Sequence, residues 1–508
     1  MTLTKPKPAA NGVSTVENLE QYFAAFRENI VGQDQTFDAP MGKRRILYAD
    51  WTASGRLYRP IENKMLEKFA PFIANTHTET SVTGTAMTHA YHRARHIIKQ
   101  HVNAAPTDCL ISYGSGMTGV INKFQRILGL KIPEKQRANF VISAADRPVV
   151  FVTHMEHHSN QTSWIETICD VEVIAPNTEG LVDLDNLNIL LEKYRHRTVK
   201  IAAVTACSNV TGIETPYHDI AAMMHRVGGL CFVDFACSAP YVAIDMHPTN
   251  PQHGDDGFLD AIYFSPHKFL GGPGTAGILI FNARLYDNRV PDNPGGGTVK
   301  WTNPWKEHEF IDNIEDREDG GTPPFLQTIR TALCIQLKEK MGVEKILQRE
   351  KQLLTLIFNE LQTVEGLHIL ADAHRHRLGV VSFYIENLHF NLGVKLLNDH
   401  FGIQVRGGCS CAGTYGHYLL EVNESVSKLL TEQITNGDLT NKPGWIRMSI
   451  HPTMTDAEVL DICKAIKSLV ENHAVWSKNY NYDVTTNEFR HRHFEDKTES
   501  DVAAWFEL

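Results

Sequence analysis

Short apolar runs alternate with amphipathic stretches along most of the chain. Seven runs rich in β-branched and aromatic residues predict strands, and the stretches between several of them have helical periodicity. The predicted strands cover residues 140–146, 148–154, 171–176, 200–207, 229–236, 260–266 and 277–282. Strands that alternate with helices favour a mostly parallel sheet covered on both faces, so the predicted fold class is α/β.

The alternation breaks at residues 284–325, which are rich in Gly, Pro and Trp and predict a functional loop insertion. A second unit follows, with one long helix predicted over 330–362 and further helices and strands typical of a small α+β domain. The expected organisation is an N-terminal arm and helix at 1–44, a large domain at 45–325, a small C-terminal domain at 326–477 and a charged extension at 478–508. Residues 1–14 are the polar arm, and 16–30 predict its helix.

The composition excludes several classes of protein. Lys and Arg number 49 against 59 Asp and Glu in 508 residues, and this net charge of −10 argues against nucleic acid or an anionic membrane as partner. No run approaches about 18 apolar residues, so no membrane span is expected. Residues 1–12 lack the apolar core of a secretory signal. Nine scattered cysteines indicate a reducing compartment, and we expect a cytoplasmic protein.

Chemistry is expected where the strands end, because the carboxyl ends of parallel strands share one edge of the sheet. Lys268 follows the strand at 260–266, and burial lowers the pKa of a lysine and frees its amine for Schiff-base chemistry. Ser265 and His267 beside it are suited to bind phosphate. Asp234 follows another strand and offers the carboxylate that the ring nitrogen of pyridoxal phosphate needs. A lysine after a strand is more often simply solvated, and an aspartate there more often forms a turn. Lys268 and Asp234 together, each after a strand, indicate pyridoxal phosphate.

Two further segments fit the same cofactor. Asn209 follows the strand at 200–207, within reach of a ring hydroxyl. Residues 114–118 precede a predicted helix, where glycines let the backbone approach a phosphate with the help of the helix dipole. By itself this glycine-containing segment is a weak signal.

The residues from 154 to 158 leave two interpretations open. His154, Glu156, His157 and His158 are potential zinc ligands, but their order departs from His-Glu-x-x-His and no distant ligand is evident. In the second interpretation, an imidazole of this segment stacks on a planar cofactor ring. We favour the second interpretation and expect no metal.

With these motifs in place, the chain resembles a known family. EHHSN, SNVTG, VDFA, SPHK and R-x-G-x-x-C-A occur in the order typical of the class V aminotransferase family. The sequence is most similar to the cysteine desulfurase and selenocysteine lyase branch, and also to the sulfurase domain of molybdenum cofactor sulfurases. The likeness covers roughly residues 45–475 and includes the early segment YADWTASGRLYRP. It implies fold type I: a large domain with a mostly parallel seven-stranded sheet, a smaller α+β C-terminal domain, and a homodimer with sites at the subunit interface.

The resemblance also implies roles for the motif residues. Lys268 would carry pyridoxal 5'-phosphate as a Schiff base, Asp234 would pair with the ring nitrogen, and His157 would stack on the ring. Asn209 would contact the ring hydroxyl or the substrate carboxylate, which Arg447 would clamp with two hydrogen bonds. The implied phosphate contacts are Gly116, Met117, Thr118, Ser265 and His267.

Two positions depart from the family pattern. Cys237 stands where the family commonly has glutamine, and Met117 replaces a usual hydroxyl residue of the phosphate loop, so its contact would be made by the backbone alone. Neither departure removes the cofactor chemistry, and both leave the substrate open.

Cys411 falls at the position where the family forms a persulfide. The resemblance implies an enzyme that removes sulfur from L-cysteine, or selenium from selenocysteine, gives alanine, and passes the sulfur to an acceptor protein. Cys409 would relay sulfur, form a C-x-C disulfide, or have no role. Transamination, epimerisation and β-elimination of another amino acid are the alternative reactions. A non-catalytic metal- or partner-binding protein on the same scaffold is the alternative from another class.

Overall fold

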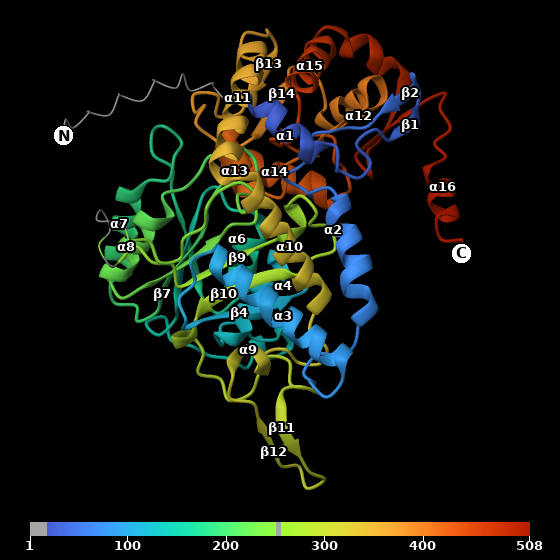
Figure 1. Cartoon of the computed structure of the whole chain (residues 1–508). Coiled ribbons are helices and arrows are strands. Elements are labelled where there is room, and N and C mark those ends of the chain that lie inside the picture. The colour runs from blue at the N-terminus through green and yellow to red at the C-terminus, as the bar shows by residue number, and fades with distance from the viewer. Residues whose placement is uncertain (1–17, 250–253, 255, 508) are drawn as a thin grey trace, which may run out of the picture.

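A computed structural model describes residues 18–249, 254 and 256–507, and the polar arm predicted at 1–14 lies outside this part of the chain. Figure 1 shows a large sheet with helices on both sides and, above it, a smaller unit formed mainly by the C-terminal third of the chain. Among the described residues, no helix combines the length and the apolar character needed to cross a membrane.

The large sheet has seven strands in the order β4-β10-β9-β8-β7-β5-β6. All neighbours from β9 to β6 are parallel, whereas β10 is antiparallel to both β4 and β9. The predicted α/β class and mostly parallel seven-stranded sheet are therefore confirmed. The strands are β4 (Asp108–Tyr113), β5 (Val149–Thr153), β6 (Asp170–Ile174), β7 (Lys200–Thr205), β8 (Leu230–Asp234), β9 (Ala261–Phe264) and β10 (Gly277–Asn282).

The strand predicted at 140–146 is wrong, and β4 takes its place in the sheet. Phe140 and Val141 are exposed, Val141 by 91%, so this apolar run lacks the buried partner that a sheet strand requires. In β4, by contrast, the first five of six residues are buried against β10 and nearby helices. The two runs, 108–113 and 140–146, have similar hydrophobicity. Only the first is buried by other elements, and only the first forms a strand.

Side chains along each strand alternate between two apolar layers. Val150 and Val152 of β5 belong to a core formed with α4 (Met117–Ile127) and α6 (His158–Ile165). Phe151 points to the opposite layer, which includes α7 (Leu184–Lys193) and α8 (Tyr217–Arg226). Because both faces are covered, polar groups of the sheet gather at the ends of its strands.

The smaller unit contains an antiparallel sheet in the order β13-β14-β17-β16, and its long helix differs from the prediction. One helix was expected over 330–362, but Gly342, with φ +80°, separates α10 from α11. Glycine adopts this backbone conformation without the strain that a Cβ causes. The elements are β13 (Leu367–Ile369), β14 (Val380–Ile385), β16 (Arg406–Gly408), β17 (Trp445–Ser449), α10 (Phe325–Met341), α11 (Val343–Leu361), α12 (Phe390–Phe401) and α15 (Asp456–Trp476).

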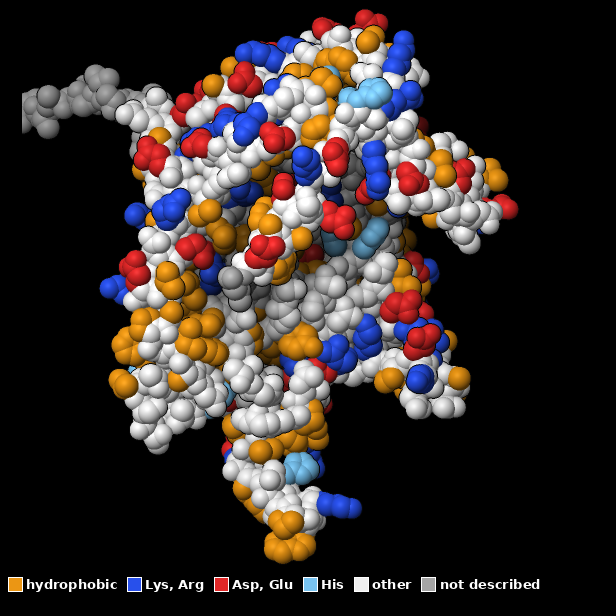
Figure 2. Space-filling model, turned by 90° about the vertical axis from the view of Figure 1, so that its right-hand side faces the viewer, with side chains coloured by type: hydrophobic (Ala, Val, Ile, Leu, Met, Phe, Trp, Pro, Cys, Tyr) orange, Lys and Arg blue, Asp and Glu red, His pale blue; other side chains and the backbone are white. Residues whose placement is uncertain are grey.

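The 284–325 segment forms a projecting hairpin, β11 (Val299–Thr302) and β12 (His308–Phe310), followed by α9 (Ile314–Arg317). It extends from the bottom of the molecule in Figure 1, and Figure 2 shows apolar side chains at its tip. The 478–508 segment, whose structure the sequence did not indicate, forms the hairpin β18 (Tyr480–Asp483) and β19 (Glu488–His491) and then α16 (Thr498–Ala504).

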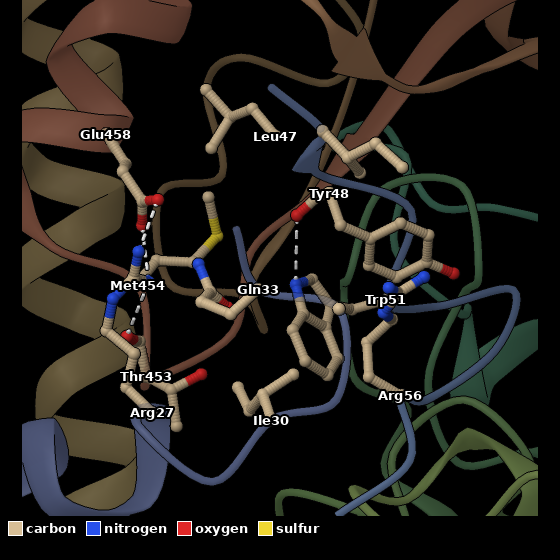
Figure 3. A pocket seen from close by; sticks show the side chains of 12 residues that line it. Arg27, Ile30, Gln33, Leu47, Tyr48, Trp51, Arg56, Thr453, Met454 and Glu458 are labelled. Atoms are coloured by element: carbon tan, nitrogen blue, oxygen red, sulfur yellow. Dashed lines mark hydrogen bonds and ion pairs between the residues drawn. The ribbon is translucent and has the colours of Figure 1, made fainter. Parts of the chain in front are cut away.

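The segment that follows α1 (Leu19–Arg27) is fixed to the smaller unit around a small cavity of about 20 Å³ (Figure 3). Arg27 donates two hydrogen bonds to Glu458, at 2.6 and 2.5 Å. Trp51 stacks on His451 with ring centroids 4.1 Å apart and donates to the Tyr48 carbonyl at 3.1 Å. The cavity has room for about one water and is too small for a substrate. The contacts around it attach the YADWTASG segment to the smaller unit.

The remaining helices and strands complete the chain. They are β1 (Thr36–Ala39), β2 (Gly42–Arg45), β3 (Leu47–Tyr48), α2 (Arg59–Lys64), α3 (Val82–His101), α5 (Glu134–Arg137), β15 (Ile403–Gln404), α13 (Gly413–Leu419) and α14 (Glu424–Thr435).

Candidate active site

A cavity of about 210 Å³ opens where β5, β7, β8 and β9 end, and we call it the strand-end cavity. Residues from the smaller unit close its other side. Most of the site residues predicted from the sequence line it: Met117, Thr118, His157, Asn209, Asp234, Ser265, His267, Lys268, Cys411 and Arg447. Gly116 lies directly behind, since a Cβ on it would be 3.1 Å from Ser265 Oγ. The structure therefore brings the predicted residues together, while their roles remain predictions.

Lys268 ends a short 3-10 turn that follows β9 directly. The turn is held from behind by Gly55, whose N–H donates to the His267 carbonyl at 2.9 Å. A Cβ on Gly55 would lie 1.9 Å from the Phe269 carbonyl oxygen, so only glycine fits this contact. Burial lowers the pKa of Lys268, while Cys237 and Asp234 oppose the shift. A lysine amine in these surroundings is easier to deprotonate than one in water.

Asp234 is the last residue of β8 and is buried at the floor of the cavity. Its Oδ1 accepts a hydrogen bond from the Ala236 N–H at 2.8 Å. Burial raises the pKa of Asp234 to about 6, although the Ala236 N–H and the Lys268 amine both favour the ionised form. A cationic ring nitrogen placed against this carboxylate would supply the opposite charge that it lacks.

His157 is fixed by the helix that it begins. Its Nδ1 accepts the Ser159 N–H at 3.1 Å, which caps α6 and leaves Nε2 as the protonated nitrogen of the neutral ring. Burial and, to a smaller extent, the Lys268 charge lower the pKa of His157 to about 3. The imidazole is therefore neutral at physiological pH, as stacking on an aromatic ring beside a lysine requires.

The start of α4 forms a concave site, and Gly116 leaves its centre free of a side chain. The Met117 N–H donates to Ser265 Oγ at 2.8 Å, and the Thr118 hydroxyl lies 2.7 Å from that of Ser159. The Gly116 backbone faces Ser265 and His267 so closely that a Cβ would be 3.1 Å from each. Hydroxyls, an imidazole and a helix N-terminus around one opening suit a phosphate.

Asn209 and Arg447 both have polar atoms without a partner. Asn209 Nδ2 donates to the Ser410 carbonyl at 2.7 Å, but its buried Oδ1 has no hydrogen bond. Arg447 donates to Asp50 Oδ1 at 2.7 Å and to the Asn209 carbonyl at 3.2 Å, and its buried Nε is unpartnered. Buried polar groups are rarely left without a hydrogen bond. The Asn209 oxygen can therefore accept from a ligand in the cavity, and the Arg447 Nε–H can donate to one.

The loop that carries Cys411 has an unusual backbone. Ser410 and Cys411 both have positive φ, +52° and +58°, a conformation that non-glycine residues adopt at a cost. The Cys411 carbonyl accepts the His158 N–H at 2.7 Å, and His158 Nε2 accepts the Gly413 N–H at 2.9 Å. Cys411 lines the strand-end cavity, whereas Cys409 packs beside the core, and neither forms a disulfide.

The four candidate zinc ligands have different partners in the structure. His154 Nε2 lies 3.1 Å from the Gly180 carbonyl, and His158 contacts the Cys411 loop. Glu156 is buried and accepts hydrogen bonds from Thr153, Asn160 and Thr205, which tie β5, α6 and β7 together. Within the described ranges, no group of three or more potential ligands is arranged to hold a metal.

Several residues of the cavity were not singled out by the sequence. Arg406 comes from β16 and Thr52 from the YADWTASG segment, and the buried Thr52 hydroxyl oxygen has no partner. Cys207 and Thr205 come from the end of β7. Arg406 opens the R-x-G-x-x-C-A motif, and Thr52 lies in the YADWTASGRLYRP segment. Membership of these two family motifs is the sequence feature that could have indicated both residues.

The comparisons with known proteins agree with this geometry. The family model described as aminotransferase class-V matches residues 47–462, and the chain belongs to this family. A probable cysteine desulfurase of Staphylococcus epidermidis is 28% identical over 380 residues, 73% of this chain and 84% of that protein. A probable cysteine desulfurase of Halalkalibacterium halodurans is 28% identical over 375 residues, 72% and 84% of the two chains.

Solved structures give the same fold. The apo structure of a cysteine desulfurase from Thermococcus onnurineus superposes with a TM-score of 0.69 at 22% identity, covering 88% of this chain and 98% of that one. The cysteine desulfurase CsdA of Escherichia coli, in an S-sulfonic acid form, gives 0.67 at 20% identity, with 88% and 98% covered. The expected family and fold are therefore confirmed.

Proposed function

We propose that the chain is a pyridoxal phosphate-dependent cysteine desulfurase that takes sulfur from L-cysteine, or selenium from selenocysteine, and releases alanine. The observation that carries the proposal is that Cys411, Lys268 and Arg447 line one cavity. A thiol, an amine of lowered pKa and a carboxylate-binding guanidinium are the groups that this reaction needs. The names of the similar proteins support the same activity.

The residues of the cavity fit the cofactor. Asp234 would face the ring nitrogen, the unpartnered Asn209 Oδ1 would accept from the ring hydroxyl, and the neutral His157 would cover one ring face. The phosphate would lie at the start of α4, against Gly116 and Ser265. When bound, the cofactor supplies an electron sink for the charge that develops at the substrate α-carbon.

The chain's own residues then have separate tasks. Arg447 holds the substrate carboxylate, and Lys268 Nζ takes the α-proton, because burial has already lowered its pKa. The Cys411 thiolate attacks the substrate sulfur, so that an S–S bond forms while the carbon–sulfur bond breaks. The β-carbon takes up a proton in place of sulfur, and Lys268 Nζ returns a proton to the α-carbon, so that alanine leaves. Cys411 retains the transferred sulfur as a persulfide for an acceptor protein.

We also propose a cytoplasmic homodimer. Nine cysteines without a disulfide suit a reducing compartment. Trp301 and Trp305 of the β11–β12 hairpin are 48% and 79% exposed, and such apolar surface favours burial against another subunit.

Replacing each cysteine of the C-x-C pair separately tests the proposed reaction. With L-cysteine as substrate, Cys411→Ser is expected to lose at least about 10²-fold in sulfide and alanine production, because its alcohol cannot accept sulfur. Cys409→Ser is the matched control and should keep most activity. Alkylation and mass spectrometry should find the persulfide on Cys411. Full activity of Cys411→Ser would instead favour transamination, epimerisation or β-elimination at the same site.

A further inference from the structure

Two thiols besides Cys411 line the strand-end cavity. Cys207 follows β7 and Cys237 follows β8, and these strands are adjacent and parallel. Their sulfur atoms approach the same acceptor, the Ser208 carbonyl oxygen, at 3.6 and 3.7 Å. Because they share this acceptor, the two sulfur atoms lie near each other. Both thiols are free in this structure, and each faces the cavity from an otherwise buried position.

The two thiols differ in their electrostatic surroundings. The neighbouring Cys207 thiol lowers the pKa of Cys237, and the Lys268 and Arg447 cations also lower it, against the opposing effect of burial. Burial raises the pKa of Cys207 instead. Since the thiolate is the nucleophilic form of cysteine, Cys237 is the thiol prepared to react first.

We propose that Cys207 and Cys237 form a redox-active dithiol, which a hydroperoxide converts to a disulfide inside the strand-end cavity. The Cys237 thiolate attacks one oxygen of hydrogen peroxide, so that the O–O bond breaks, a sulfenic acid forms and water leaves once the leaving oxygen is protonated. The Cys207 sulfur then attacks the Cys237 sulfur, the S–O bond breaks, and a second water leaves. Two thiols lose two electrons and two protons, and one hydrogen peroxide becomes two waters.

The position of the pair gives the oxidation a consequence for the site. The Cys237 charge lies close enough to Lys268 to raise the pKa of that amine. A disulfide carries no charge and donates no hydrogen bond, so its formation removes this support and joins the ends of β7 and β8 covalently. Reduction by a small dithiol, which is itself oxidised to a disulfide, restores both thiols.

Mapping of the cross-link in the holoenzyme tests the proposal. The protein is treated with a small excess of hydrogen peroxide, its free thiols are alkylated, and it is digested with trypsin without reduction. Neither 201–225 nor 227–267 contains a Lys or Arg, so the disulfide should link peptides 201–226 and 227–268. Fragmentation should place the link at Cys237, because Cys231 lies in the same peptide.

Cys231 provides the matched control, since it is buried in β8 with its sulfur directed toward the Tyr217 carbonyl, 3.9 Å away. The cross-link should persist in Cys231→Ala and in Cys411→Ser, disappear in Cys207→Ala, and reverse with dithiothreitol. In Cys207→Ala, dimedone should trap a sulfenic acid on Cys237. Alkylation of both Cys207 and Cys237 after peroxide has oxidised Cys411 would overturn the proposal, as would a link through Cys231. The wild-type mapping needs no variant to fold and is independent of sulfur transfer, so its outcome does not depend on the proposed desulfurase activity.

Discussion

The side-chain amide of Asn209 donates a hydrogen bond to the carbonyl of Ser410, 2.7 Å away and 201 residues later in the chain. One side chain at the end of β7 thereby holds the loop that carries Cys411 over the strand-end cavity. The adjacent residues Ser410 and Cys411 both have left-handed backbones, so the loop needs such external contacts to keep its conformation.

Asn209→Ala is expected to loosen this loop. Loss of the hydrogen bond costs about 1–2 kcal/mol, so amide hydrogen exchange of residues 409–413 should accelerate by roughly 5- to 30-fold. Asn288→Ala is the matched control, because Asn288 makes a similar amide-to-carbonyl bond to Ile127 at 2.9 Å away from the cavity. Unchanged exchange at 409–413 in Asn209→Ala would show that the His158 contacts alone hold the loop.

Gly55→Ala should disturb the turn that carries Lys268. Its new methyl would meet the Phe269 carbonyl at 1.9 Å, and backbone cannot move aside as a flexible side chain does. We expect a loss of about 1–3 kcal/mol in the free energy of unfolding, comparable with overpacking in a core, and weaker retention of the proposed cofactor. Chemical denaturation and absorbance after dialysis measure both. Gly296→Ala, which meets no atom within 4 Å, should change neither.

Glu350→Gln should stabilise the protein increasingly as pH rises. Glu350 is buried, and burial raises its pKa from 4.5 to about 8 despite the hydrogen bond from the Gly379 N–H. Between these values the folded carboxyl keeps a proton that the unfolded chain releases, so wild-type stability falls with rising pH. Glutamine does not titrate.

The measured quantity is the difference in the free energy of unfolding between Glu350→Gln and wild type. It should be near its minimum below pH 4.5, grow through the interval up to pH 8, and reach on the order of 1–3 kcal/mol. Glu432→Gln, at an exposed position of α14, is the control and should show no such slope. A difference that is independent of pH would contradict a raised pKa at Glu350.

Arg447→Lys tests the proposed substrate clamp. Arg447 already donates to Asp50, and the planar guanidinium can present a further pair of N–H groups to a second carboxylate, a geometry that a lysine ammonium lacks. We expect KM for L-cysteine to rise about 10- to 100-fold, the equivalent of roughly 1.5–3 kcal/mol for charged hydrogen bonds, with a smaller change in kcat. An unchanged KM would mean that this guanidinium bonds only Asp50 and the Asn209 carbonyl and does not bind the substrate.

The positions of the site residues were accessible from the sequence because each follows a recognisable strand. Asp234 ends β8, Lys268 follows β9, and Asn209 follows β7, so a correct assignment of three apolar runs was enough to place them at one edge. Their motifs also carried the family resemblance, which the family match over residues 47–462 confirms.

What the sequence could not provide were relationships between distant segments. The strand at β4 and the exposed run at 140–146 have similar apolar character, and only packing against β10 separates them. Asp50 and Arg447 are 397 residues apart, and no local pattern pairs them. The proximity of Cys207 and Cys237, which share the Ser208 carbonyl, likewise depends on β7 and β8 being neighbours.

The reversed direction of β10 determines where its connections go. It begins beside Gly116, where a Cβ on Gly277 would be 2.3 Å from the Gly116 carbonyl, and it ends at the opposite edge of the sheet. The β11–β12 hairpin consequently extends from the bottom of the molecule, on the side away from the smaller unit (Figure 1). A shortened hairpin would leave the strand-end cavity of its own chain intact, so altered turnover in such a deletion would support the proposed homodimer.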